Sequence, residues 1–158
     1  MPVVLSDKEI TKLITEPKIL PQNYQELVKL KSKRGHKEAE LDLDGTDGSK
    51  FRLILRQSSF DPFDFSVILA YHVPKTNVLF RLRRYNGKSH EHTNKIEGET
   101  FYDFHIHHAT ERYQQLGLRE DGYATLANQY ADLHGALQSV LKECGFVMPP
   151  NTQFELGF

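Results

Sequence analysis

Five of the eight histidines in this 158-residue chain lie within residues 87–113. His90 and His92 are separated by one residue, and so are His105 and His107. Residues two apart on a β-strand project from the same face, so a strand would direct the members of each pair together. Imidazole titrates near neutral pH and also binds transition metals. The spacing therefore predicts a chemically active site, and three interpretations of it remain open.

The first interpretation is a metal site. An H-x-H pair on a strand can direct two rings at one ion, and zinc accepts imidazole nitrogen readily. The cofactor would be zinc or another divalent metal. The candidate ligands are His90, His92, His105 and His107.

The second interpretation is acid–base catalysis on a phosphate-containing ligand, with RNA or a nucleotide as the candidate partner. His90 or His92 would act as the base and His107 as the acid, because two histidines can supply both proton transfers of a phosphodiester cleavage. Cationic and amide side chains close by would hold the phosphate. These candidate substrate-binding residues are Arg84, Asn86, Lys88 and Asn94. The enzyme would be a nuclease or phosphodiesterase, either independent of metal or dependent on it.

The third interpretation involves no catalysis. Loop histidines often bond backbone carbonyls, and an arginine at a strand end often extends its charged group to solvent. The chain would then be a binding or assembly module whose histidines hold a metal or fix the loop. Its partner would be another protein or a second copy of the chain.

Familiar catalytic motifs are missing from the sequence. It contains no phosphate-binding glycine loop, no H-E-x-x-H and no G-x-S-x-G. His108-Ala109-Thr110 has the H-x-T form of the two-histidine phosphoesterases, but the chain has no second copy of that motif.

Two adjacent segments predict a β-hairpin with a defined register. Apolar residues alternate with charged ones over residues 38–44 and again over residues 51–56. Pairing Leu41 with Leu53 aligns the apolar faces and sets Asp42 opposite Arg52. A slip of one residue would move every side chain to the other face, so this register is strongly specified.

Further strands are expected on both sides of the histidine-rich loop. Residues 63–73 and 78–85 alternate in the same way, and Asn86-Gly87 is a strong turn dipeptide. In residues 78–85, Arg84 has the parity of the apolar positions. Residues 100–107 read as one strand that displays His105 and His107 together with Asp103. Its other face, formed by Tyr102, Phe104 and Ile106, would join the core.

Helices are expected at both ends of the chain. Ser6 and Glu9 form a capping box ahead of a short helix that Pro17 ends. Residues 22–36 fit either a helix or a strand, and residues 109–116 predict a short helix. Residues 123–144 repeat apolar positions at three- and four-residue spacing, which predicts a helix of about six turns. The fold class is therefore α+β: an antiparallel β-meander of about five strands packed against a long C-terminal helix and shorter helices.

Length and composition predict the number of domains and the cellular location of the protein. The length predicts a single domain over residues 1–158, with residues 148–158 as an extended tail. A formal charge of −1 gives no general attraction to nucleic acid or to anionic membranes, and Cys144, as the only cysteine, has no internal disulfide partner. No run of residues is apolar enough to cross a membrane. We expect a cytoplasmic protein with no membrane partner.

Two stretches of the sequence resemble known protein families. The stretch Arg84-Tyr85-Asn86-Gly87-Lys88-Ser89-His90-Glu91-His92, followed by Phe104-His105-Ile106-His107-His108, resembles an uncharacterised prokaryotic protein family. It is also distantly similar to TumE-type toxins of toxin–antitoxin systems. The similarity spans roughly residues 51–113, and it departs from the toxin pattern because Asn86 directly follows Tyr85 and Ser89 precedes His90. The resemblance implies an α+β fold and a toxin-like or defence-associated role, with RNA as the expected target. The matching positions are Arg84, Asn86, His90, His92 and His107.

Overall fold

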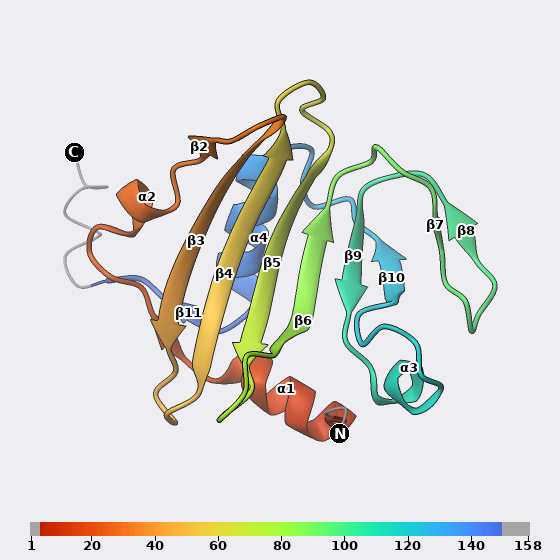
Figure 1. Cartoon of the computed structure of the whole chain (residues 1–158), viewed down its shortest axis with the longest axis horizontal. Helices are drawn as coiled ribbons and strands as arrows, with labels where there is room; N and C mark the ends of the chain where they lie inside the picture. The colour runs from red at the N-terminus through yellow and green to blue at the C-terminus, as the bar shows by residue number, and fades with distance from the viewer. Residues whose placement is uncertain (1–3, 150–158) are drawn as a thin grey trace.

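The computed structural model describes residues 4–149. A seven-stranded antiparallel sheet forms its centre, in the order β10-β9-β6-β5-β4-β3-β2 (Figure 1). The helices are α1 (Asp7–Thr15), α2 (Tyr24–Leu27), α3 (Glu111–Gln115) and α4 (Leu133–Glu143). The strands of the sheet are β2 (Lys31–Ser32), β3 (His36–Asp44), β4 (Lys50–Ser58), β5 (Phe65–His72), β6 (Leu79–Asn86), β9 (His105–His108) and β10 (Tyr123–Leu126). Two small pairs stand apart from it: β1 (Lys18–Ile19) with β11 (Phe146–Val147), and β7 (His92–Thr93) with β8 (Thr100–Phe101).

The predicted α+β class and antiparallel meander are confirmed, although the sheet has seven strands. The expected hairpin register is also confirmed, because Leu41 faces Leu53 and Asp42 faces Arg52 across β3 and β4. Residues 22–36 contain both of the alternatives that the sequence allowed, since α2 is followed by β2. The expected tail is described only as far as residue 149, and residues 150–158 lie outside the described part of the chain.

One face of the sheet holds the core and the other is open. Figure 1 shows α4 behind β4 and β5 and no helix across the front of these strands. Side chains of α1 and α4 pack against the rear face, with Leu53, Leu69 and Val140 fully buried. Burial of this kind contributes about 1.5–3 kcal/mol for each large apolar side chain.

The prediction of a six-turn helix over residues 123–144 is wrong. Tyr123–Leu126 forms strand β10, which pairs with β9, and the helix begins only after Asp132, whose side chain accepts a hydrogen bond from the Gly135 amide. The apolar spacing misled the prediction because the edge of β9 offers residues 123–126 a ladder of backbone hydrogen bonds. Pairing with β9 therefore stabilises residues 123–126 as a strand, although their apolar spacing is that of a helix.

The predicted strand 100–107 is likewise divided. Residues 102–104 separate β8 from β9, and the Asp103 carboxylate accepts a hydrogen bond from the Phe104 amide at 2.8 Å. Tyr102 is 63% exposed, so it does not belong to the core as expected. His105 and His107 do share a face of β9, but both are buried, at 4% exposure each, instead of being displayed to solvent.

A β-bulge in β6 decides which side chains face the open side. Ala70 of β5 pairs with Arg81 and Leu69 pairs with Arg83, so Leu82 is an extra residue without a partner on β5. A bulge of this kind inverts the alternation beyond it. Arg84 therefore lies on the open face and Tyr85 in the core, whereas the sequence parity put Arg84 with the apolar residues.

A buried lysine joins the two ends of the described chain. The Lys18 ammonium donates hydrogen bonds to the carbonyls of Leu13, Ile14, Glu16 and Cys144, at 2.8–2.9 Å. Three of these residues follow or end α1, and Cys144 caps the end of α4. Carbonyls at helix ends lack partners within their own helices. Lys18 therefore satisfies both helix ends with one charge.

No helix among residues 4–149 has both the length and the apolar character required to cross a membrane.

We expect Lys18→Met to lower the free energy of unfolding by about 3 kcal/mol, because buried carbonyls would lose a charged donor while the apolar stem is kept. Urea denaturation monitored by circular dichroism measures the change. Lys12→Met, at an exposed position of α1, is the matched control and should change stability by less than about 0.5 kcal/mol. Equal effects of the two substitutions would contradict this role of Lys18.

Candidate metal centre

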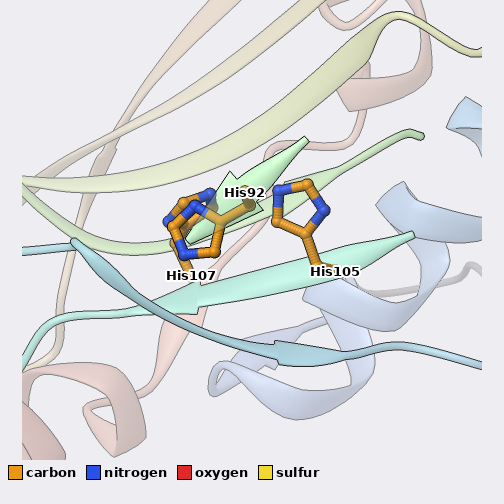
Figure 2. A group of neighbouring side chains, drawn as sticks. All are labelled: His92, His105 and His107. Carbon is orange, nitrogen blue, oxygen red and sulfur yellow. The ribbon is translucent and has the colours of Figure 1, made fainter. Parts of the chain in front are cut away.

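Three histidines meet on the open side of the sheet. His105 and His107 come from β9 and His92 comes from β7, and Figure 2 shows the three rings gathered together. One ring nitrogen from each lies within 4.8 Å of the other two. The ring centroids are 4.7 Å apart for His92 and His107 and 4.9 Å apart for His105 and His107. Two segments separated by a turn therefore supply one cluster.

The β7–β8 hairpin is fastened to the sheet by Asn94. The Asn94 side chain is fully buried, and its oxygen accepts a hydrogen bond from the Ala124 amide at 2.8 Å. Its nitrogen donates to the Ala124 carbonyl, also at 2.8 Å. The amide thus pairs with the outer edge of β10 as a neighbouring strand would. This contact sets β7, and with it His92, beside β9.

Hydrogen bonds fix the tautomer of each ring. His105 Nδ1 and His107 Nδ1 lie 2.7 Å from the carbonyl oxygens of Asp103 and Asp121. His92 Nε2 lies 2.7 Å from the Asn94 side-chain oxygen, whose orientation is set by Ala124. Carbonyl oxygens only accept, so each of these ring nitrogens donates a proton. The unprotonated nitrogens are therefore His92 Nδ1, His105 Nε2 and His107 Nε2.

The surroundings keep the two β9 rings neutral. Burial, assisted by the nearby charges of Arg84 and His105, lowers the pKa of His107 to about 2. Burial also lowers the pKa of His105. A metal ligand must be neutral imidazole, so this environment favours coordination. The same environment argues against the predicted role of His107 as a general acid, because a ring with this pKa does not carry the second proton of an imidazolium near neutral pH.

The cluster has the donor set of a three-histidine metal centre. Rings bound to a metal almost always donate their other N–H to an oxygen, as all three do here. Three nitrogens bound tetrahedrally to zinc would lie about 3.3 Å apart, given Zn–N distances of about 2.0–2.1 Å. The three rings would need only a modest inward movement to reach this spacing. They are the residues that could hold a divalent ion.

A pocket of about 530 Å³ opens over the cluster. Arg84 lies in its wall and faces His107 across β6 and β9. Arg84 Nε is 3.0 Å from the buried Asp121 carboxylate, and the Arg84 guanidinium makes no other hydrogen bond within residues 4–149. Its two terminal nitrogens therefore remain available to a ligand.

Asn86 supplies a second donor in the same wall. It faces His105 across β6 and β9, and its side-chain oxygen accepts a hydrogen bond from the Ser66 hydroxyl at 2.8 Å. The Asn86 amide nitrogen is left to face the pocket that the residue lines. Two predicted substrate-binding residues thus lie next to the histidine cluster.

The other predicted site residues lie elsewhere. His90 is 77% exposed in a bend before β7, and its ring lies 3.6 Å from the Asp64 carboxylate. It lines the pocket mouth but is not brought into the cluster. The Lys88 ammonium lies over the Phe63 and Phe104 rings at 4.9 and 5.1 Å. Asn94, with both amide atoms bonded internally, holds the hairpin and does not face a ligand.

Sequence reasoning missed a buried acid behind the site. The Asp121 carboxylate is fully buried between the guanidinium groups of Arg81, Arg84 and Arg119, at 3.6, 3.0 and 3.5 Å. Its backbone carbonyl also holds the His107 ring. Arg119-Glu120-Asp121 is a run of charges in the sequence, and such a run is usually solvent-exposed. No local signal separates it from an ordinary surface turn.

Comparison with known proteins gives one match. Residues 5–145 match DUF6978, described as a family of unknown function. The chain belongs to this family. No curated protein and no solved structure matches it. The DUF6978 match covers the sheet, the β7–β8 hairpin and all three clustered histidines, so the candidate centre lies within the part of the chain that defines its family membership.

We expect the purified chain to bind one zinc or cobalt ion, with a tetrahedral cobalt absorption spectrum. His107→Gln should abolish stoichiometric binding because it removes one of three ligands. His134→Gln, at an exposed position of α4, is the control and should bind as the wild type does. Cobalt titration followed by visible absorption tests this, and unchanged binding by His107→Gln would eliminate the centre.

Asn94→Asp should lower zinc affinity about 10–100-fold, the usual cost of losing a partner that orients a ligand. A carboxylate there would face the Ala124 carbonyl without a proton to donate, so the hairpin would lose its anchor and His92 its orientation. Competition with a chelator measures the affinity, and circular dichroism checks that the sheet remains folded. Thr93→Ala, an exposed neighbour, should have little effect. A variant that keeps full affinity would show that Asn94 does not position His92.

Proposed function

We propose that this DUF6978 protein is a metal-dependent phosphodiesterase that acts on RNA or a related phosphate-containing ligand. His92, His105 and His107 hold a divalent ion, and Arg84 and Asn86 bind the phosphate. The observation that carries the proposal is the cluster of ring nitrogens from His92, His105 and His107, which lies in the pocket that Arg84 also lines. The proposed setting is the cytoplasm, consistent with a single buried cysteine.

The number of ligands supports a reactive site over a purely structural one. Structural zinc sites close with four protein ligands, whereas catalytic sites provide three and leave a position for water or substrate. Within residues 4–149 the cluster contains three ligands, and the pocket lies over them. A substrate entering from the pocket would reach the open position directly.

The chemistry follows from the placement of the donors. A divalent ion in this position supplies a Lewis acid and lowers the pKa of the attacking water. Arg84 and Asn86 would donate to the non-bridging phosphoryl oxygens, where negative charge increases during attack. The water oxygen would form a bond to phosphorus as the bond to the leaving oxygen breaks, and the proton released by the water would pass through solvent to that leaving oxygen. The backbone carbonyls of Asp103 and Asp121 hold the rings of His105 and His107 in place, and these rings exchange no proton with the substrate.

A mechanism without metal receives less support from the same geometry. Acid–base cleavage would require one histidine to arrive protonated, but the His107 ring is buried and its pKa lies at about 2. His90, one of the two candidate bases, lies with its ring 3.6 Å from the Asp64 carboxylate and outside the cluster. A metal-dependent mechanism requires a neutral His107 ring, because only an unprotonated imidazole nitrogen can bind the ion.

A ribonuclease of this kind would suit a toxin-like or defence-associated role, the role implied by the resemblance to TumE-type toxins. Expression of the wild type should then arrest growth, and His107→Gln should relieve the arrest. Normal growth with active enzyme would remove the toxin role while leaving the catalytic proposal intact.

We expect hydrolysis of an activated phosphodiester that stops with a chelator and returns with zinc. Arg84→Lys should lower kcat/KM about 100-fold, because the fork of donors to the phosphoryl oxygens is lost, while metal stoichiometry is retained. Arg52→Lys, on a different part of the open face, is the matched control and should keep its rate. Hydrolysis that persists in chelator, or that Arg84→Lys does not change, would refute the mechanism.

A second candidate function is a non-enzymatic, metal-stabilised binding or assembly module, with another protein or a second copy as partner. The favouring observation is that the cluster joins the β7–β8 hairpin to β9, so a bound ion would cross-link two segments. In that case zinc would raise the melting temperature without any hydrolysis, and the Arg84→Lys variant would behave as the wild type does.

A further inference from the structure

The pocket over the histidines continues into a second hollow on the open face. This hollow, of about 410 Å³, is bordered by His36, Arg56 and Gln57. It shares Asp64, Phe65 and Ser66 with the wall of the first pocket. The two form one groove that runs from Arg119 past the histidine cluster to Arg56. A ligand that occupied both hollows would be larger than a mononucleotide held in the first one alone.

We propose that this groove binds single-stranded nucleic acid, which lies across the histidine cluster with its bases against an aromatic rim. The inference rests on the proposed function for the identity of the reacting group, and it names the substrate as a polymer. Two independent features of the groove carry it: its exposed rings and its spaced cations.

The exposed rings gather beside the groove. Among the exposed large hydrophobic side chains of residues 4–149, the aromatic ones are Phe60, Phe63 and Tyr102, at 86%, 43% and 63% exposure. Phe60 and Phe63 lie in the loop before β5, next to Asp64 of the groove wall, and Tyr102 lies just before β9. Apolar rings left in solvent mark binding surfaces more often than aliphatic residues scattered singly.

The rim is attached to the groove wall by hydrogen bonds. The Tyr102 hydroxyl donates to the Ser89 carbonyl at 3.0 Å, and the Lys88 amide donates to the Phe63 carbonyl at 2.9 Å. A Cβ on Gly87 would lie 1.8 Å from the Phe63 carbonyl oxygen, so glycine permits this close approach. Phe63 and Tyr102 are thereby both attached to residues 87–89, next to the pocket, where bases leaving it could stack on their rings.

The charges along the groove suit a phosphate backbone. Arg56, Arg84, Lys95 and Arg119 line it, opposed by the carboxylates of Asp64 and Glu91. Lys88 adds a further cation at the rim, above the Phe63 ring. Arg84 and Arg119 meet at Asp121 at the histidine end of the groove, and Arg56 lies in the second hollow. Spaced cations with planar rings between them match the alternating phosphates and bases of a single strand.

Fluorescence anisotropy tests the proposal, using the zinc-loaded full chain with labelled single-stranded RNA and DNA of about 10 nucleotides. Gel electrophoresis in parallel reports any cleavage. Phe63→Ala and Tyr102→Ala should each weaken binding at least about fivefold, because each removes a stacking platform. Val78→Ala, an exposed apolar residue in the turn before β6 and remote from the groove, is the control and should leave binding unchanged. Tighter binding of RNA than of DNA would assign the polymer as RNA, and the reverse would assign it as DNA.

Salt dependence tests the cations separately. Arg56→Ala should reduce the slope of log affinity against log salt by about 0.7, the value for one phosphate contact on a single strand. Binding of a mononucleotide at the histidine end should not change in this variant, because Arg56 lies in the second hollow. An unchanged slope would overturn the path through that hollow.

Failure of this inference is distinguishable from failure of the proposed function. Hydrolysis of the small phosphodiester without oligonucleotide binding tighter than about 1 mM would overturn the polymer and leave the enzyme. Oligonucleotide binding with the expected losses but without hydrolysis of any substrate would support the groove and refute the catalytic proposal. Equal losses in the rim variants and in Val78→Ala would also overturn it, because the rim would then have no particular role.

Discussion

The candidate site depends on one buried amide. The fully buried Asn94 side chain donates a hydrogen bond to the Ala124 carbonyl and accepts one from the Ala124 amide. Its oxygen also accepts a hydrogen bond from the His92 ring, so one side chain makes all three contacts. The Glu99 carboxylate accepts its remaining amide proton at 3.3 Å, which completes the bonding capacity of the group. A buried amide is costly unless it is fully paired, so the fit is exacting. Without it, β9 would still offer two histidines, but no third ring would be held against them.

The second constraint is the bulge at Leu82. The core face of β6 demands apolar residues, and strict alternation would bury Arg84 among them. The extra residue lets Phe80 and Leu82 remain buried and Tyr85 reach Val67 in the core, while Arg84 turns to the open face opposite His107. Bulges often redirect a side chain beside an active site. Beyond the inserted residue, Tyr85 still packs toward α4, while Arg84 and Asn86 on the opposite face of β6 line the pocket.

Predictions from the sequence succeeded where the side chains of the strands themselves specify the register or the face on which a residue lies. The β3–β4 register followed from apolar pairs on one face and opposite charges on the other, and the shared face of His105 and His107 followed from strand parity. They failed where a distant partner decided the outcome. Residues 123–126 have helical spacing but become a strand because β9 presents an unpaired edge. The roles of Asn94 and Asp121 depend on contacts 30 and 14 residues away, with Ala124 and His107, and no local pattern reports them.

The balance of charge explains why an anionic ligand suits this site. The three clustered rings are neutral ligands, and the cluster includes no carboxylate, so a bound divalent ion would keep its full charge. The nearest buried acid, Asp121, is already shared among three guanidinium groups, and Arg81 bonds to Glu120 as well. One carboxylate cannot neutralise three guanidinium groups, so Asp121 compensates the positive charge of Arg84 and Arg119 only in part. Partly buried like charges repel strongly, since the interior screens them less than water does. A phosphate at the open position would offset the ion and the arginines together, and a neutral ligand would offset neither.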